Sequence, residues 1–344
     1  MSIKGQVTIK DLAKELGISP STVSKALKNN PDISESTRSK VISLARKLKY
    51  NPNPIALSLR SSKTKIIGLV IPQIVHHFFS SVISGIEDVA YDAGYSVMIY
   101  QSNESYNREV MACDALMSSR VEGLLISLSK ETRNYDHLKR MVDYGLPMVM
   151  YDRVCDEIKT DKVTVDDYEG AYGAVSHLIG SGCKKIAHLT GPPGLRITDL
   201  RRSGYLDALQ DHNMKIDRDI IVYCDNFKQS LIRTKQLMNL AQAPDAIFTV
   251  NDLTATGVMK SLAEMGKRVP QDVSLIGFSN SLISQVTNPT LTTVDQHGYQ
   301  MGQTAVQLLL DRLIRKEGEQ PFIHQVLKTD LVVRGSTKKS HILS

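Results

Sequence analysis

Short polar segments follow four buried, strand-like runs of this chain, and their residue types suit binding better than bond-breaking chemistry. In chain order they are Ser127, Asp152-Arg153, Asn251-Asp252 and Ser279-Asn280. Arg201, which opens a helical pattern after the loop GPPGLRITD, could donate two parallel hydrogen bonds to vicinal hydroxyls or to a carboxylate. Because ligands of parallel sheets gather at the carboxyl ends of strands, these side chains predict a binding site for a small polar molecule.

Signatures of catalysis and of metal binding are missing from the sequence. It has no G-x-S-x-G or H-E-x-x-H motif, and GPPGLR lacks the G-K-[ST] of a phosphate-binding loop. His76 and His77 are adjacent, whereas ligating pairs on a helix are spaced by three or four residues, and the four cysteines form no C-x-x-C pair. We therefore predict a protein that is not an enzyme, with no catalytic residue, metal or cofactor. The alternative for Asp152 and Asp252 is a structural role without ligand contact, since an aspartate after a strand can cap the next helix or turn.

The elements that would position these side chains alternate between strand and helix patterns from residue 65 onward. The apolar runs lie at 66–71, 95–100, 123–127, 147–152, 185–191, 220–224, 246–252 and 274–280. Strands rich in Val, Ile and Leu and separated by helical patterns indicate parallel sheets that are covered on both faces. The predicted fold class is α/β, with two doubly wound parallel-sheet lobes, a ligand cleft between them and an all-α N-terminal head.

The head holds the positive charge excess of the chain. Residues 1–65 contain 13 Lys and Arg against 4 Asp and Glu, whereas the other 279 residues contain 29 against 32. Lysines and arginines that neutralise phosphates release condensed counterions, which supplies most sequence-independent affinity for nucleic acid. The charge distribution therefore predicts that attraction for a polyanion resides in this one module.

Three short helices are expected in the head. Thr8 is a good N-cap for the first, which carries an apolar stripe and ends at Gly17. Ser19 caps the second, with Pro20 at its first position, and Ser34 caps the third. Two short helices joined by a tight glycine turn and braced by a third form a helix-turn-helix.

In a helix-turn-helix the start of the second helix enters the major groove, where short side chains and long donors reach base edges. Pro20, Ser21, Lys25 and Lys28 lie on that helix, and we predict that Lys25 reads a base. The alternative is a helical hairpin that is used for protein contacts.

A segment between two prolines and a polar run, NPNPIALSLRSS at 51–62, follows the head. Isolated helices under about 12 residues are marginal in water, so its order would have to come from DNA or from a second copy of the chain. A leucine beside an arginine at this place suits insertion into a minor-groove base step. The alternative is a flexible linker in which Leu57 and Leu59 are incidental.

These residues resemble the head and hinge of the lactose/galactose repressor family, over VTIKDLAKELGISPSTVSKALKNNPDISESTRSKVISLARKLKYNPN and then IALSLR. The resemblance continues through IIGLVIP, VEGLLIS, GLPMVMYDR, IFTVND, VSLIGFSN and LTTVDQ. It implies that Leu59 pries open the central base step, whereas Leu57 departs from the Arg or Gln of many members. The residues expected to contact DNA are Thr8, Ser19, Pro20, Ser21, Thr22, Ser24, Lys25, Lys28, Asn29, Ser34, Thr37, Asn53, Ala56, Leu59 and Arg60.

The same resemblance implies a set of effector contacts in the cleft. They are Phe78 or Phe79, Ser127, Asp152, Arg201, Asn251, Ser279 and Gln296. The two phenylalanines could instead be core residues, and adjacent side chains on a regular element do not both face one way. Ser279 stands where the family commonly has a carboxylate that accepts hydroxyl hydrogen bonds. A sugar is the expected effector, and a purine or nucleoside that stacks on phenylalanine is the alternative.

A symmetric homodimer would allow two heads to read a pseudo-palindromic operator in double-stranded DNA. The expected divisions are 1–52 for the head, 53–64 for the hinge, 65–165 plus 294–326 and 166–293 plus 327–336 for the lobes, and 337–344 for a tail. The N-terminus lacks an apolar signal region and no run is long enough to cross a bilayer, so we expect a cytoplasmic protein with no membrane contact. A non-regulatory small-molecule binding protein is the rival interpretation; it would need an export signal and would have no use for the basic head.

Overall fold

The computed structural model describes residues 7–51, 64–314 and 321–339, and the chain divides into two compact units, Met1–Lys65 and Ile66–Ser344. The first unit contains α1 (Ile9–Leu16), α2 (Pro20–Leu27) and α3 (Glu35–Lys47). The predicted helix ends are confirmed: Thr8, Ser19 and Ser34 each accept a hydrogen bond from the first turn, and Gly17 ends α1 in the left-handed conformation. The three helices share a core of Leu12, Ala13, Val23, Ala26, Val41 and Ala45.

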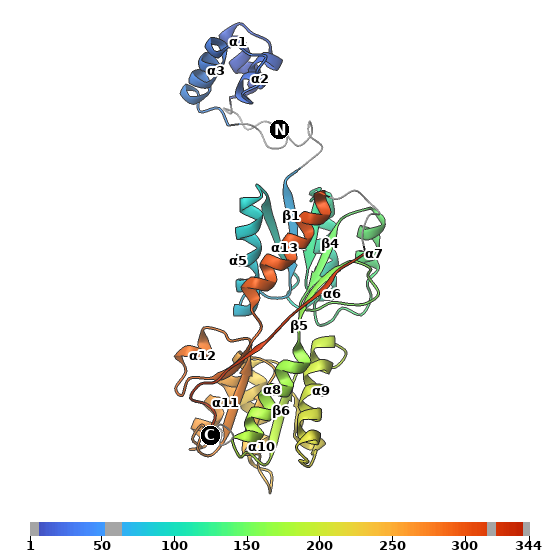
Figure 1. Ribbon diagram of the computed structural model, residues 1–344, viewed down its shortest axis with the longest axis vertical. Coiled ribbons are helices and arrows are strands. Elements are labelled where there is room, and N and C mark those ends of the chain that lie inside the picture. Colours follow the sequence, from blue (N-terminus) through green and yellow to red (C-terminus); the bar gives the residue numbers. More distant parts are fainter. Residues whose placement is uncertain (1–6, 52–63, 315–320, 340–344) are drawn as a thin grey trace. The chain divides into compact units, whose positions relative to one another are not determined.

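The second unit has two lobes, each built on a six-stranded sheet (Figure 1). The sheet of the first lobe has the order β11-β5-β4-β3-β1-β2, and all of its pairs are parallel. Its strands are β1 (Ile66–Ile71), β2 (Ser96–Gln101), β3 (Gly123–Ile126), β4 (Met148–Tyr151), β5 (Asp161–Val165) and β11 (His324–Leu327). Its helices are α5 (His77–Asp92), α6 (Tyr106–Ser118), α7 (Asp136–Asp143) and α13 (Gly298–Ile314).

The second lobe repeats this plan with the order β12-β10-β9-β8-β6-β7. Only β12 runs antiparallel to its neighbour, a difference from the predicted all-parallel sheet. The strands are β6 (Ile186–Thr190), β7 (Ile221–Tyr223), β8 (Ala246–Thr249), β9 (Ser274–Phe278), β10 (Thr292–Asp295) and β12 (Asp330–Val332). The helices are α8 (Asp167–Gly180), α9 (Arg196–Asp211), α10 (Phe227–Met238), α11 (Asp252–Glu264) and the short α12 (Ile283–Val286), with a 3-10 turn at Arg218–Ile220.

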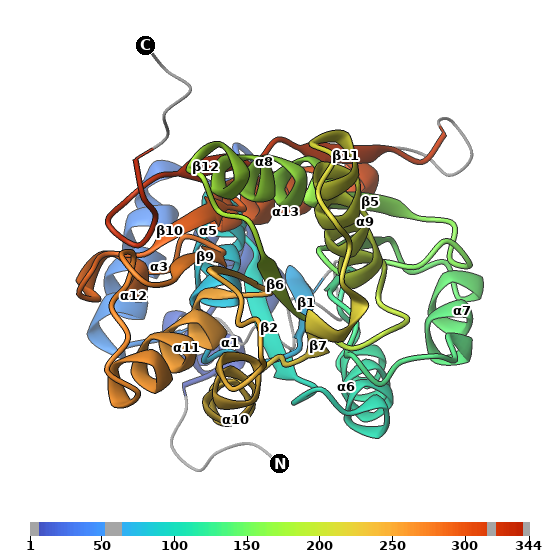
Figure 2. The same cartoon turned by 90° about the horizontal axis from the view of Figure 1, so that it is seen from below.

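Helices cover both faces of each sheet, as Figure 2 shows for α8 and α9 opposite α10 and α11. Alternate residues of one strand enter opposite cores: Phe248 packs among side chains of α8 and α9, and Ile247 among those of α10 and α11. In the first lobe, Leu125 and Leu124 divide in the same way between α5 with α13 and α6 with α7. Two-sided burial explains the continuous apolar runs of the sequence.

The chain passes between the lobes three times within the second unit. It crosses from β5 to α8, from β10 to α13 and from β11 to β12. The boundary expected between residues 293 and 294 falls inside β10, and the one expected between 326 and 327 falls inside β11. Because each strand belongs to one sheet along its whole length, residues 294 and 295 belong to the second lobe and residue 327 to the first.

No helix of residues 7–51, 64–314 and 321–339 combines the length and the apolar character that crossing a bilayer requires.

Candidate functional site

The exposed face of α2 carries most of the predicted DNA-reading side chains. Pro20, Ser21, Lys25 and Lys28 are exposed, whereas Ser24 is buried within the head. The Ser19 hydroxyl lies 2.7 Å from that of Ser21 and accepts from the Thr22 amide, so the cap fixes the first turn of the helix. Ser24 therefore differs from the prediction, because its side chain faces the interior and the other four face solvent.

Lys25 is held by one neighbour. Its ammonium lies 3.0 Å from an oxygen of Asp32, and both side chains are at least half exposed. Exposed ion pairs contribute about 0–1 kcal/mol, so DNA could replace this contact at little cost. Asn29 lies two residues after the end of α2, with φ +53°, and the Ser34 and Thr37 hydroxyls lie 2.9 Å apart at the start of α3. The hinge residues Asn53, Ala56, Leu59 and Arg60 lie outside the described residues.

A cavity of about 410 Å³ opens between the two lobes of the second unit, at the carboxyl ends of their strands. The volume lies within the range of small-molecule pockets. Seven of the eight predicted effector residues line it: Phe78, Phe79, Asp152, Arg201, Asn251, Ser279 and Gln296. Ser127 does not line the cavity, but its hydroxyl donates to Asp152 at 3.4 Å from behind.

Both phenylalanines line the cavity, contrary to the expectation that adjacent side chains would diverge. They lie in the first turn of α5 with their rings edge to face, 5.2 Å between centroids. Across the cavity the Ser279 hydroxyl donates to the side-chain carbonyl of Gln296 at 2.7 Å. Asn251 is the N-cap of α11, and its side chain accepts from the Thr254 amide.

Arg201 is buried and rigidly held at the wall of the cavity. Its Nε donates to Asp167 at 2.7 Å, its Nη1 donates to the Val250 carbonyl at 2.8 Å, and the guanidinium lies 3.7 Å from the ring centroid of Phe278. Among the described residues Nη2 has no hydrogen-bond partner. The arginine therefore keeps both N–H groups of Nη2 available in a fixed orientation, and it lines the cavity, as expected from its place after the GPPGLRITD loop.

Comparisons with known proteins agree with this architecture. Residues 8–53 match the family described as "Bacterial regulatory proteins, lacI family", and residues 175–337 match "Periplasmic binding protein-like domain". The chain is 31% identical to the transcriptional repressor CytR of Escherichia coli (strain K12) over 96% of both chains. The chain belongs to the LacI family.

Solved structures of family members share the fold over nearly the whole chain. A lac repressor dimer bound to operator and the anti-inducer ONPF superposes with a TM-score of 0.86 at 26% identity, covering 97% of this chain and 100% of that one. A complex of the regulator CelR with cellobiose gives 0.73 at 25% identity, covering 96% and 100%. This LacI-family chain is thus a transcriptional repressor with a helix-turn-helix DNA-binding region and an effector domain, and its relatives are regulators rather than enzymes.

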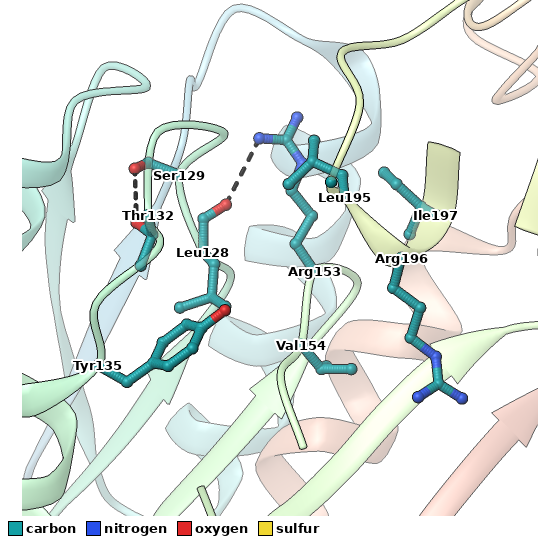
Figure 3. Close-up of a pocket in the computed structure, with 10 residues that line it drawn as sticks. Leu128, Ser129, Thr132, Tyr135, Arg153, Val154, Leu195, Arg196 and Ile197 are labelled. Atoms are coloured by element: carbon teal, nitrogen blue, oxygen red, sulfur yellow. Dashed lines mark hydrogen bonds between the residues drawn. The ribbon is translucent and has the colours of Figure 1, made fainter. Parts of the chain in front are cut away.

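Several residues that line the cavity are absent from the predicted effector contacts. Four are charged: Glu104 and Lys130 from the loops after β2 and β3, Arg153 after β4, and Asp225 after β7. Arg153 also lines a smaller adjoining pocket of about 30 Å³, where its guanidinium donates to the Leu128 carbonyl at 3.4 Å (Figure 3). Strand-end positions marked Arg153 and Asp225, but nothing in the local sequence marked Glu104 and Lys130.

Asp252 does not cap the following helix, because the N-cap of α11 is Asn251, but its carboxylate joins separate segments of the lobe. One carboxylate oxygen accepts from the amide and hydroxyl of Ser281, and the other accepts from the Thr293 hydroxyl at 2.6 Å. These bonds join the start of α11 to the segment after β9 and to β10. In the described part of the chain no group of three His, Cys, Asp or Glu side chains is placed to hold a metal ion.

Asp152 is the most perturbed acid of the cavity. It adopts φ +58° directly after β4, and burial raises its pKa to about 6, an effect that Arg153 partly opposes. A carboxyl whose pKa is higher in the folded than in the unfolded state favours unfolding as the pH rises, since the unfolded chain ionises more easily.

We therefore expect Asp152→Asn to stabilise the ligand-free repressor, by on the order of 3 kcal/mol at pH 7.5. The gain should shrink by more than half at pH 4.5, where the folded-state carboxyl is already protonated. Urea unfolding of both proteins at the two pH values measures it, and Ser127→Ala controls for loss of the hydroxyl contact alone. A gain of equal size at both pH values would contradict the assignment.

Proposed function

We propose that this repressor binds a pseudo-palindromic operator as a homodimer in the cytoplasm and is controlled by a small-molecule effector, a sugar, bound between its lobes. The observation that carries the proposal is the presence in one chain of an exposed reading helix and of a cavity lined at strand ends by hydrogen-bonding side chains. Asp152, Asn251 and Gln296 supply acceptors and donors for hydroxyl groups, and Phe79 supplies an apolar wall. The solved CelR–cellobiose complex supports a sugar.

A second copy would bring a second head to the operator and match its two-fold symmetry. Exposed apolar side chains on the edge strand β2 and on the adjoining helices α5 and α6, namely Ile99, Tyr91 and Met111, support a body-to-body contact. Sedimentation of the full-length chain, with and without operator, tests the dimer.

Control would work through the angle between the lobes. If effector favours one angle, the two hinge segments change their separation and the affinity for operator changes. By linkage, operator must alter the affinity for effector by the same factor, typically ~5-fold to 150-fold. Operator titrations with and without effector, and effector titrations with and without operator, must return equal factors.

A purine or nucleoside is the second candidate effector, because Phe78 and Phe79 both line the cavity and a base could stack on them. A thermal-shift panel of sugars, purines and nucleosides on the full-length chain separates the two. A compound that also changes operator affinity is the effector, whereas a panel with no such compound would contradict the proposal.

Base reading by Lys25 gives a sharper test of the DNA half of the proposal. We expect Lys25→Ala to weaken operator binding by roughly 1 to 3 kcal/mol and to weaken random-DNA binding far less, because a base contact belongs to the specific complex. Lys40→Ala, which removes an exposed charge from α3 of the same head, is the matched control. Gel shifts at one salt concentration measure both, and equal losses on the two DNAs would exclude base reading by Lys25.

A further inference from the structure

Charged side chains around the effector cavity are more numerous than a site for an uncharged ligand requires. Three cations line it, Lys130, Arg153 and Arg201, together with three carboxylates. Burial lowers the pKa of His76, which also lines the cavity, so this imidazole adds no charge at neutral pH. Whether the three cations are available to a ligand depends on what already binds them.

Arg153 is bound by Glu104. The carboxylate accepts from Nη1 of Arg153 at 2.7 Å and from the Lys130 amide at 2.9 Å, and both side chains are largely buried. Glu104 has φ +62° and follows Asn103 at φ +52°, two successive left-handed residues that are not glycine. Such backbone costs energy, so the turn holds the carboxylate in place at the expense of local strain. Burial alone would raise the pKa of Glu104, but Arg153 and these hydrogen bonds bring it below its ordinary value.

Lys130 is bound by Asp225, which comes from the other lobe. Its ammonium lies 3.1 Å from one carboxylate oxygen, and the other oxygen accepts from the Asn226 side chain at 3.0 Å. Burial opposes ionisation of Asp225, but the bond from Lys130 outweighs it and lowers the pKa. The pair thus spans the cleft, and the lowered pKa keeps the Asp225 carboxylate ionised at neutral pH.

Arg201 is bound by Asp167 behind the wall, as described above. Each of the three cations therefore has its own carboxylate, and Asp152 is left over. The nearest cationic atom to Asp152 is Nε of Arg153, at 3.9 Å, beyond hydrogen-bond distance. Counting Asp167, the wall carries one negative charge in excess when Asp152 is ionised.

Free N–H groups of Arg201 and Lys130 could still donate to an anionic ligand, but the charge of each cation is already balanced by its carboxylate. The charge of the ligand would therefore stay uncompensated in the cavity unless the ligand separated one of these pairs. Taking a cation from a buried partner leaves that carboxylate uncompensated, which is a strongly unfavourable state. A hydroxyl donor meets no such obstacle, since Asp152 can accept its hydrogen bond while the three pairs remain closed.

We propose that Glu104 and Asp225 are built-in counter-ions that keep Arg153 and Lys130 occupied, so that the effector is an uncharged, hydroxyl-bearing molecule and its phosphorylated forms are excluded. This inference rests on the proposed effector role of the cavity. Glu104 from the first lobe and Asp225 from the second would then determine whether the site accepts a metabolite or its phosphate ester.

Inorganic phosphate is the probe that tests the exclusion, because it needs no knowledge of the effector. Thermal unfolding of the full-length chain is followed during phosphate titration at constant ionic strength, with chloride as the balancing salt. Glu104→Gln frees Arg153, and Asp225→Asn independently frees Lys130. We expect saturable stabilisation of at least one variant, with an apparent dissociation constant at least about tenfold lower than that of the unaltered chain.

Asp114→Asn is the matched control, since it also neutralises one carboxylate and frees one arginine, Arg140, but on the surface. It should respond to phosphate as the unaltered chain does. Saturable phosphate binding by the unaltered chain would overturn the proposal, and so would two folded variants that gain none.

The thermal-shift panel of metabolites provides a second, independent test of the exclusion of phosphate esters. Each neutral compound is tested beside its phosphate ester, and a response to an ester but not to its parent would also overturn the proposal. If no compound of the panel acts, the effector role fails while the phosphate titration still decides whether the counter-ions exclude anions.

Discussion

Removal of residues 1–62 is expected to abolish operator binding and to leave effector binding unchanged. Residues 1–62 carry a net charge of +7 and the remaining residues one of −1, so truncation leaves no positive excess to attract DNA. Every described cavity residue lies in the unit that begins at Ile66, and that unit has its own cores. Specific affinity typically exceeds non-specific affinity by a factor of 10³ or more, so we expect a loss of at least about that size.

Gel shifts with operator at moderate salt measure the first half of this prediction. Calorimetric titration of the truncated chain with the compound identified by the panel measures the second half. The untruncated chain from the same preparation is the control, and circular dichroism verifies that the truncated chain is folded. Operator affinity that survives the truncation would show that the reading surface lies elsewhere.

Replacement of Arg201 by alanine should remove the effector response while operator binding persists. The variant loses the donor that faces the cavity and leaves Asp167 buried without its cation. Breaking a buried pair in this way costs roughly 3 to 5 kcal/mol, so the second unit should also unfold more easily. Operator binding should survive because the head folds around a separate core.

Two further variants separate loss of the donor from loss of stability. Arg202→Ala removes an exposed arginine one position along α9 and should behave as the unaltered chain does. Arg201→Lys keeps the charge beside Asp167 but cannot reproduce the planar fork, so it should recover stability more than effector binding. A calorimetric titration of Arg201→Ala that matched the unaltered chain would exclude this residue from the site.

Most of the fold could be predicted from the sequence because helix caps and apolar strands are each recognisable within a few consecutive residues. Caps at Thr8, Ser19 and Ser34 and the long apolar runs of the central strands could be identified without any partner. Four strands were missed. The internal strands β5 and β10 contain polar residues, and the edge strands β11 and β12 are largely exposed, so none of the four forms a continuous apolar run. Such strands form because they pair with a neighbouring strand, and the residues of that neighbour lie elsewhere in the chain.

The residues of the cavity also fall into two groups, those that local sequence could predict and those that it could not. Asp152, Asn251 and Ser279 follow strands, so their place could be predicted from the rule for parallel sheets. The ion pairs of Glu104 and Asp225 could not be predicted, because the cation that each of them binds lies 49 or 95 residues away in the sequence. Ser24 was misplaced for a related reason: its exposure depends on how three helices pack.

The three crossings between the lobes constrain how proteins of this architecture can diversify by recombination. A single breakpoint near residue 65 exchanges the reading head and joins an existing sensor to a new set of target genes. Exchange of one lobe needs three breakpoints at once, between β5 and α8, between β10 and α13 and between β11 and β12. A head and a complete pair of lobes can therefore be exchanged as units, whereas the effector preference within one pair of lobes changes more readily by point substitution than by exchange of a single lobe.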